Sequence, residues 1–145
     1  MSSRRTSRHR AVQVLYQCDM RALSADQAIS AFYGGLYSEE NEEQPEKDPF
    51  MEALVHGALQ AKAEIDERIS KYSERWRIER MPAVDRNILR MAIFELMQAE
   101  TPAPVVIDEA IELARRFSGE ESAPFVNGVL DSVRKEIESL PNAKG

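Results

Sequence analysis

Hydrophobic residues recur every three or four positions along most of the chain, the spacing that places them on one face of an α-helix. Ser24 precedes the second such stretch, which runs to Leu36, and serine is a favoured N-cap residue. Residues 38–47 then interrupt the pattern with a polar segment that holds five glutamates. The pattern therefore predicts two helices before this segment, separated by a turn near Ser24.

Asp48 and Pro49 mark the start of the next predicted helix, because aspartate caps helices well and proline is tolerated at the first helical position. The apolar stripe that follows extends to Tyr72, which predicts one continuous helix of about 22 residues. Gly57 lies within this stripe beside Ala58. We therefore expect another helix to approach closely at Gly57.

Further helices are predicted in the second half of the chain. They cover Ala83 to about Ala99, a stretch around Ile107 that ends at Gly119, and a last stretch from Phe125 to Leu140. Pro104 should force residue 103 toward extended geometry, and the three apolar residues that follow are too few for a strand. The chain thus holds about six helices with short connections, which indicates an all-α class.

The helices divide at a midpoint near Trp76, with about three on each side. We expect one domain built from an N-terminal bundle over about residues 4–75 and a C-terminal bundle over about residues 76–140. Residues 1–10 would form a basic N-terminal arm.

Charge is distributed unevenly along the chain. The 145 residues are 43% hydrophobic and 30% charged, with a net charge of −6. Residues 1–18 carry four arginines and no acid, so the remaining part of the chain carries −10. A basic terminus on an acidic body indicates contact with a polyanion.

Several classes of protein are excluded by the composition. No apolar run approaches the ~18 residues that a membrane span needs. Cys18 is the single cysteine, so an intrachain disulfide and a cysteine-rich metal site are both excluded. His9 and His56 lack metal-ligand spacing, and no phosphate-binding loop or nucleophile motif is present. We therefore expect a binding protein without catalytic residues, metal or cofactor.

The arm offers several guanidinium groups within a few residues, and each can clamp a phosphate with two hydrogen bonds. Helical spacing places Arg4 and Arg8 on one side, with Arg5 about one step round. Such segments often stay mobile until RNA orders them, although this arm runs directly into the apolar face at Val12. A solubilising tail without a partner remains the alternative interpretation.

Specific recognition of RNA would require aromatic stacking and base contacts in addition to charge. Tyr16 follows the arm on the same helix, and Phe125 and Asn127 lie in the first turn of the last predicted helix. Free backbone N–H groups in a first turn favour phosphate binding. Packing in the core remains the competing interpretation of both aromatic residues.

Four sequence motifs together resemble the NusB family of bacterial transcription antitermination factors. They are RHRAVQVLYQ at residues 8–17, DRNILRMAIFEL at residues 85–96, PVVIDEAIELA at residues 104–114 and FVNGVLD at residues 125–131. Their order and spacing agree with the family over roughly residues 4–137, which makes the resemblance specific.

The resemblance implies two helical bundles packed across each other and a non-catalytic role. The single cysteine fits a reducing, cytoplasmic setting. Proteins of this family bind the boxA RNA element of nascent ribosomal RNA transcripts. They do so together with ribosomal protein S10 (NusE), in a complex with other Nus factors that keeps RNA polymerase elongating.

The resemblance also implies roles for individual residues. Thr6 stands where another arginine can occur in the arm. The RNA-binding residues implied by the family are Arg4, Arg5, Arg8, Tyr16, Glu121, Phe125 and Asn127. The residues implied to contact NusE are Tyr16, Asp85 and Arg90. For Arg90, an internal ion pair with Glu95 or Glu109 is an equally good interpretation.

Other functions remain open at this point. Domains like this also precede the catalytic domain of some ribosomal RNA methyltransferases, but this chain lacks that domain and its catalytic cysteine. A helical scaffold that binds only protein is a second alternative. A homodimer that NusE displaces is also consistent with the sequence.

Overall fold

The computed structural model describes residues 3–36, 46–74 and 76–140, and these residues fold into helices without a strand. Seven helices are present in this part of the chain. They are α1 (Arg4–Arg21), α2 (Ala25–Leu36), α3 (Pro49–Gln60), α4 (Lys62–Tyr72), α5 (Ala83–Gln98), α6 (Ala103–Phe117) and α7 (Ser122–Ser139). The predicted all-α class is confirmed.

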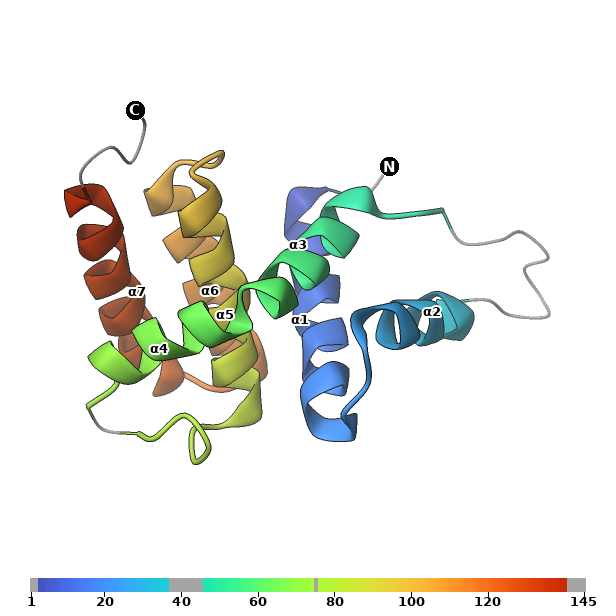
Figure 1. Cartoon of the computed structure of the whole chain (residues 1–145), viewed down its shortest axis with the longest axis horizontal. Helices are drawn as coiled ribbons and strands as arrows, with labels where there is room; N and C mark the ends of the chain where they lie inside the picture. Colours follow the sequence, from blue (N-terminus) through green and yellow to red (C-terminus); the bar gives the residue numbers. More distant parts are fainter. Residues whose placement is uncertain (1–2, 37–45, 75, 141–145) are drawn as a thin grey trace.

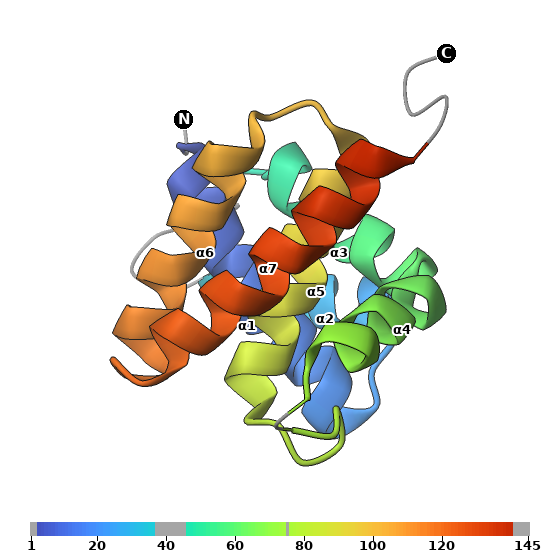
Figure 2. The same ribbon diagram turned by 90° about the vertical axis from the view of Figure 1, so that its left-hand side faces the viewer.

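Helix α5 is the centre of the fold, because it contacts α1, α3, α4, α6 and α7. Figure 1 shows α1 and α2 on one side of α5 and α6 and α7 on the other. Figure 2 shows α7 crossing in front of α5 with α6 alongside. One continuous cluster of buried apolar side chains draws residues from all of these helices, so the chain forms a single domain.

The expected helix boundaries at Ser24, Asp48 and Gly119 are confirmed. The Oγ of Ser24 accepts a hydrogen bond from the backbone N–H of Gln27 at 3.1 Å. The Oδ1 of Asp48 accepts one from the N–H of Met51 at 3.0 Å. Gly119 follows α6 with a φ of 127°, a conformation that glycine adopts without strain.

The prediction of one long helix after Asp48 is wrong, because the helix is interrupted at Ala61. This residue has φ −97° and ψ 14° and separates α3 from α4. The apolar spacing continues through the interruption, so the pattern carried no sign of it. The interruption allows α3 to pack against α1 and α5, whereas α4 packs against α5 and α7.

Two further helix starts differ from the sequence prediction. Helix α6 begins at Ala103, so this residue is helical although Pro104 follows it. Helix α7 begins at Ser122, which places Asn127 beyond the first turn. The free N–H groups at the start of α7 therefore belong to earlier residues.

The expected close approach at Gly57 is confirmed. Helix α5 supplies Phe94, whose ring lies over Gly57, and a Cβ at this position would overlap with the ring carbons. The contact joins α3 directly to the central helix.

We predict that Gly57→Ala destabilises the protein by about 1–3 kcal/mol, because the added methyl forces Phe94 out of its position. The matched control is Gly34→Ala in α2, where an added Cβ meets nothing within 4 Å. That substitution should stabilise by about 0.5–1 kcal/mol. Denaturant unfolding of both variants measures the difference, and an equal effect of the two substitutions would contradict the packing argument.

Candidate nucleic-acid interface

Residues 4–10 of the arm form the first turns of α1. Ser3 caps the helix by accepting a hydrogen bond from the N–H of Thr6 at 3.1 Å, and its hydroxyl donates to the Thr6 hydroxyl at 3.0 Å. Thr6 is therefore part of the helix cap. The buried residues Ala11 and Val12 follow in the same helix, which anchors the arm to the core as expected.

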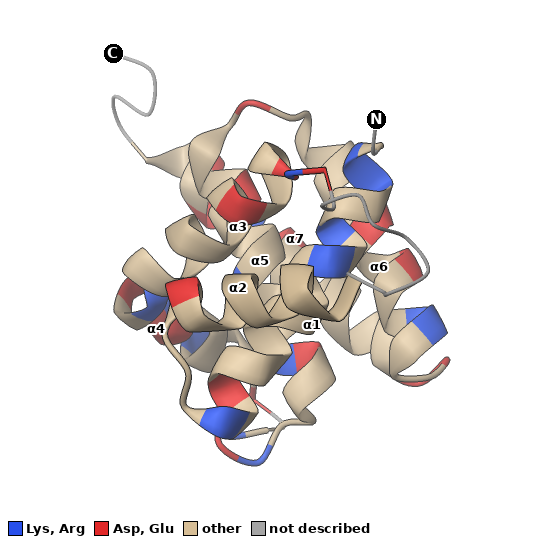
Figure 3. Ribbon diagram, turned by 90° about the vertical axis from the view of Figure 1, so that its right-hand side faces the viewer, with Lys and Arg blue, Asp and Glu red and all other residues tan. Residues whose placement is uncertain are grey.

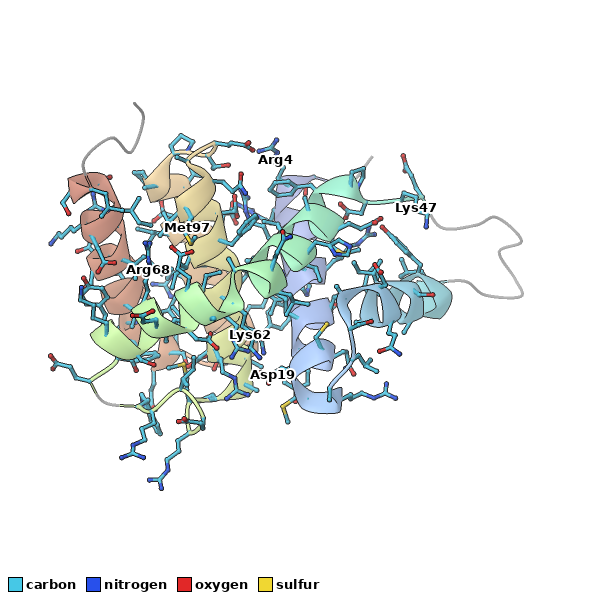
Figure 4. The ribbon with its side chains drawn as sticks, viewed as in Figure 1. Arg4, Asp19, Lys47, Lys62, Arg68 and Met97 are labelled. Atoms are coloured by element: carbon cyan, nitrogen blue, oxygen red, sulfur yellow. The ribbon has the colours of Figure 1, made fainter. Side chains whose placement is uncertain are left out.

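Arg4 and Arg8 share one side of α1, as their spacing predicts. Their guanidinium carbons lie 4.5 and 5.4 Å from the centre of the Phe50 ring. Arg4 is exposed, and Figure 4 shows it at the opposite end of α1 from Asp19. The Phe50 ring thus orients an arginine that is open to solvent.

Arg5 lies on the neighbouring side of α1 and pairs with Glu109 of α6. Its Nε donates to both carboxylate oxygens at 3.2 and 3.1 Å, and its Nη2 donates to one of them at 3.1 Å. These hydrogen bonds raise the pKa of Arg5. The Arg5 side chain is 76% exposed and the Glu109 side chain is 16% exposed. A phosphate would compete with Glu109 for the same donors.

Arg8 differs from the expectation, because its guanidinium is buried against a carboxylate of the same chain. Its Nε donates to Glu95 Oε1 at 2.6 Å and its Nη2 donates to Glu95 Oε2 at 2.9 Å. Both side chains are only 5% exposed. In this conformation Arg8 attaches α1 to α5 and offers no donor to a phosphate.

Arg10, the fourth arginine of the arm, pairs with Asp48 at 3.2 Å. Asp48 also accepts hydrogen bonds from the hydroxyl of Ser7 at 2.8 and 2.9 Å. Figure 3 shows this arrangement at the level of the ribbon, with basic segments at the start of α1 beside acidic segments of neighbouring helices. Carboxylates of the body therefore orient most of the arm's arginines.

Arg90 is internal, but the expected partners Glu95 and Glu109 are wrong. Its Nε and Nη2 donate to Asp66 at 2.8 and 2.9 Å, and its Nη1 donates to Asp19 at 3.3 Å. Spacing along the sequence could not identify these carboxylates, which come from α4 and α1. The buried guanidinium presents no surface to NusE.

Asp19 connects the far end of α1 to the central helix. It accepts hydrogen bonds from Arg86 at 2.7 Å and from Asn87 at 3.0 Å. Burial alone would raise the pKa of Asp19, but these hydrogen bonds and the positive charges of Arg86 and Arg90 outweigh it and lower the pKa. The two ends of α1 are thus both attached to α5 by ion pairs.

Asp85 is buried rather than exposed at a partner surface. It accepts a hydrogen bond from the hydroxyl of Ser122 at 2.9 Å, which ties the start of α5 to the start of α7. The expectation that Asp85 contacts NusE is not supported by this burial. Its position indicates a role in holding the turn between α6 and α7.

This turn borders an open hollow of about 770 Å³. Trp76, Glu121 and Phe125 line it, together with Asp85 and the turn itself. Glu121 is exposed and Phe125 is half-buried, whereas Asn127 is exposed on the next turn of α7. The structure thus brings Glu121 and Phe125 together, as the sequence predicted, and adds Trp76 to them.

A second hollow, of about 540 Å³, runs along α1. Tyr16 is partly exposed and lines it, with Phe32 and Phe117 also contributing aromatic rings. Sequence reasoning assigned Phe117 only to an apolar stripe. The available signal was its place as the last apolar residue before Gly119, where a helix face meets a turn.

His9 faces this second hollow and contacts Phe117, with ring centres 4.4 Å apart. Burial and the positive charge of Arg116 lower the pKa of His9. The imidazole is therefore more strongly held in its neutral form than an exposed histidine.

The two hollows are neighbours. Val84 and Phe117 line the hollow along α1, and the residues that follow them in sequence, Asp85 and Ser118, line the hollow at the turn between α6 and α7. The candidate surface therefore continues from the arm, along α1, to the start of α7.

Among the residues that the structure describes, no helix is both long and apolar enough to cross a membrane. No group of metal-ligating side chains occurs in residues 3–36, 46–74 and 76–140.

Exposed arginines and aromatic side chains along one surface of an all-helical domain are features shared by many nucleic-acid-binding proteins. The NusB family model matches residues 5–135, and the chain belongs to the NusB family. Members of this family are not enzymes.

Relatives match over almost the whole chain. A transcription antitermination protein NusB of Solibacter usitatus is 56% identical over 143 residues, covering 99% of this chain and 95% of the relative. The protein of the same name from Bacillus subtilis is 41% identical over 136 residues, covering 93% of this chain and 97% of the relative.

Solved structures share the fold. NusB of T. maritima superimposes with a TM-score of 0.78 at 34% identity, covering 93% of this chain and 92% of that one. A crystal structure of antitermination factors NusB and NusE in complex with dsRNA contains a chain that superimposes with a TM-score of 0.78 at 27% identity. The match covers 92% of this chain and 96% of that one.

We predict that Arg8→Ala destabilises the protein by about 3–5 kcal/mol, because it leaves the buried Glu95 carboxylate without its partner. The double variant Arg8→Met with Glu95→Leu should recover most of this loss, since no buried charge then remains. Arg5→Ala, which breaks an exposed pair, should change stability little. Urea unfolding measures all three. A mild effect of Arg8→Ala would show that Glu95 is readily hydrated.

We also predict that the pKa of the His9 imidazole lies below the ordinary value of about 6.5 in the folded protein, and near that value in the urea-unfolded chain. Because the unfolded chain then binds more protons, this group lowers stability as the pH falls below about 6.5. NMR titration of His9 measures the midpoint. Arg116→Gln should raise the pKa of His9 in the folded protein. A pKa in the folded protein at or above the pKa in urea would contradict the burial of the imidazole ring.

Proposed function

We propose that this protein is a non-catalytic transcription antitermination factor that binds boxA RNA of nascent ribosomal RNA transcripts together with ribosomal protein S10 (NusE). It would act in the cytoplasm, in a complex with other Nus factors and RNA polymerase. The relatives named above support this role. The structure of NusB and NusE with dsRNA, which shares the fold, supports the two partners.

The arm is the observation that carries the proposal. Arg4 and Arg5 are exposed on adjacent sides of one helix, and the helix is fixed to the body through Arg8. Guanidinium groups that are held in place lose less freedom when they bind phosphates than groups on a mobile tail. We assign phosphate contacts to Arg4 and Arg5, and the positioning of the arm to Arg8.

The remaining RNA-contacting residues are assigned to the surface beyond the arm. Tyr16 lies along α1, and Glu121, Phe125 and Asn127 lie on and after the turn between α6 and α7. Phe125 offers a ring for stacking, whereas Asn127 offers hydrogen bonds to base edges. Glu121 would repel phosphates close to it, which restricts the path of the RNA.

The acidic body supports the choice of a basic protein partner. Outside residues 1–18 the chain carries a charge of −10, and opposite charge accelerates encounter between proteins. NusE would supply further basic surface beside the arm. Tyr16, which is partly exposed, is the residue that we assign to the joint surface with NusE.

Binding of a boxA RNA with and without NusE at several salt concentrations tests the proposal. We predict that Arg4→Ala weakens binding to all RNA sequences alike and reduces the salt slope by about one, the loss of one phosphate contact. Lys62→Ala, which removes an exposed charge from α4, is the matched control and should change neither. No binding of boxA RNA by the wild-type pair at low salt would refute the proposal.

Tyr16→Asp tests the NusE contact. The added charge should weaken capture of NusE by the folded protein, because it is placed on the joint surface. Circular dichroism of the variant provides the control. If Tyr16→Asp unfolds the protein, then Tyr16 belongs to the core, and if a folded variant captures NusE normally, the assignment is wrong.

A further inference from the structure

We propose that Phe117, supported by His9 and flanked by Arg116, is a base-stacking site that continues the RNA-binding surface between the arm and the turn after α6. This inference rests on the proposed function and adds to it a residue outside the set assigned above. It concerns single-stranded RNA as the ligand.

The first observation is the exposure of a supported ring. Phe117 is the last residue of α6 and is 40% exposed, unlike the apolar residues of α6 that face the core. The His9 ring contacts it at 4.4 Å between centres with a tilt of 39°. A base can stack on the exposed part of this ring when the Arg116 guanidinium that lies over it moves aside.

The second observation is the positive charge that lies over the ring. The guanidinium carbon of Arg116 lies 5.4 Å from the centre of the Phe117 ring. The preceding Arg115 pairs with Glu112 at 2.8 Å and Glu120 at 3.6 Å, but Arg116 forms no ion pair within the described ranges. Its charge is therefore available to a phosphate next to a stacked base.

The third observation is the hollow into which the ring faces. Its volume of about 540 Å³ lies within the range of ligand sites. Gln13 and Gln17 supply amide donors and acceptors there, and Arg21 lies on its border. Amides and cations around aromatic rings suit base edges and phosphates.

The fourth observation is continuity. Phe117 lies in the hollow that contains Tyr16, and the adjacent Ser118 lies in the hollow that contains Glu121 and Phe125. A strand that leaves the arm and reaches Phe125 would therefore pass Phe117.

Phe117→Leu and Phe117→Tyr test the inference. Leucine keeps apolar packing against His9 but has no π-face, so boxA RNA should bind about 5- to 100-fold more weakly, the effect of losing one stacked base. Tyrosine should retain binding. Val105→Ala removes another large hydrophobic residue of α6 that is 43% exposed, and it should leave RNA affinity unchanged.

Two readouts separate stacking from other causes. With 2-aminopurine placed at successive boxA positions, one position should be quenched by the wild-type protein and not by Phe117→Leu. Arg116→Gln should lower the salt slope by about one, whereas Phe117→Leu should leave the slope unchanged because it removes no charge.

The outcomes distinguish this inference from the proposed function. If the wild-type protein binds boxA RNA and Phe117→Leu binds it equally well, the stacking site is refuted and the proposed function stands. If Phe117→Leu loses affinity for NusE while binding of RNA alone is unchanged, the ring is a protein contact and the inference is also refuted. If the wild-type protein does not bind the RNA, both are refuted.

Discussion

The buried ion pair between Arg8 and Glu95 is the interaction on which the candidate surface depends. It connects two residues that are 87 positions apart in sequence, one in α1 and one in the central helix α5. Desolvation of two charges is costly, so the pair contributes less to net stability than to the choice of one arrangement. Fixing Arg8 fixes the rotation of α1, and this rotation determines where Arg4 and Arg5 point.

The same logic extends to the carboxylates around the arm. Arg5 is held by Glu109, and Arg10 by Asp48, so the acidic body orients basic side chains that would otherwise sample many rotamers. An acidic protein can therefore present a cationic surface at one place. In the exposed ion pairs there, a phosphate can replace the carboxylate as the partner of the arginine. The net charge of −6 conceals this local organisation.

Much of the fold could be predicted from the sequence because its signals are local. Ser24 and Asp48 cap helices through residues three positions away, and Gly57 indicated a close approach by its size alone. The interruption at Ala61 could not be predicted, because the apolar spacing continues through it. Spacing also showed that Arg4 and Arg8 share a side, but it could not show which carboxylates they meet.

The candidate site was predictable only in part, because sequence motifs are local whereas burial depends on helices that are distant in sequence. Motif resemblance indicated Tyr16, Glu121 and Phe125, whereas the burial of Asp85 and Arg90 depends on helices distant in sequence. The partners of Arg90 come from α4 and α1, and no helical spacing relates them to α5. Long-range ion pairs are the part of this structure that required coordinates.

The interruption at Ala61 also determines how the domain can be divided. Because α3 lies with the first helices and α4 with the last ones, a single run of chain braces both sides of α5. A cut after residue 75 would leave α4 on a fragment without α5 and α7, the helices that cover its apolar face. The two halves of the chain are consequently interdependent folding units, and neither would be expected to persist as a compact fragment alone.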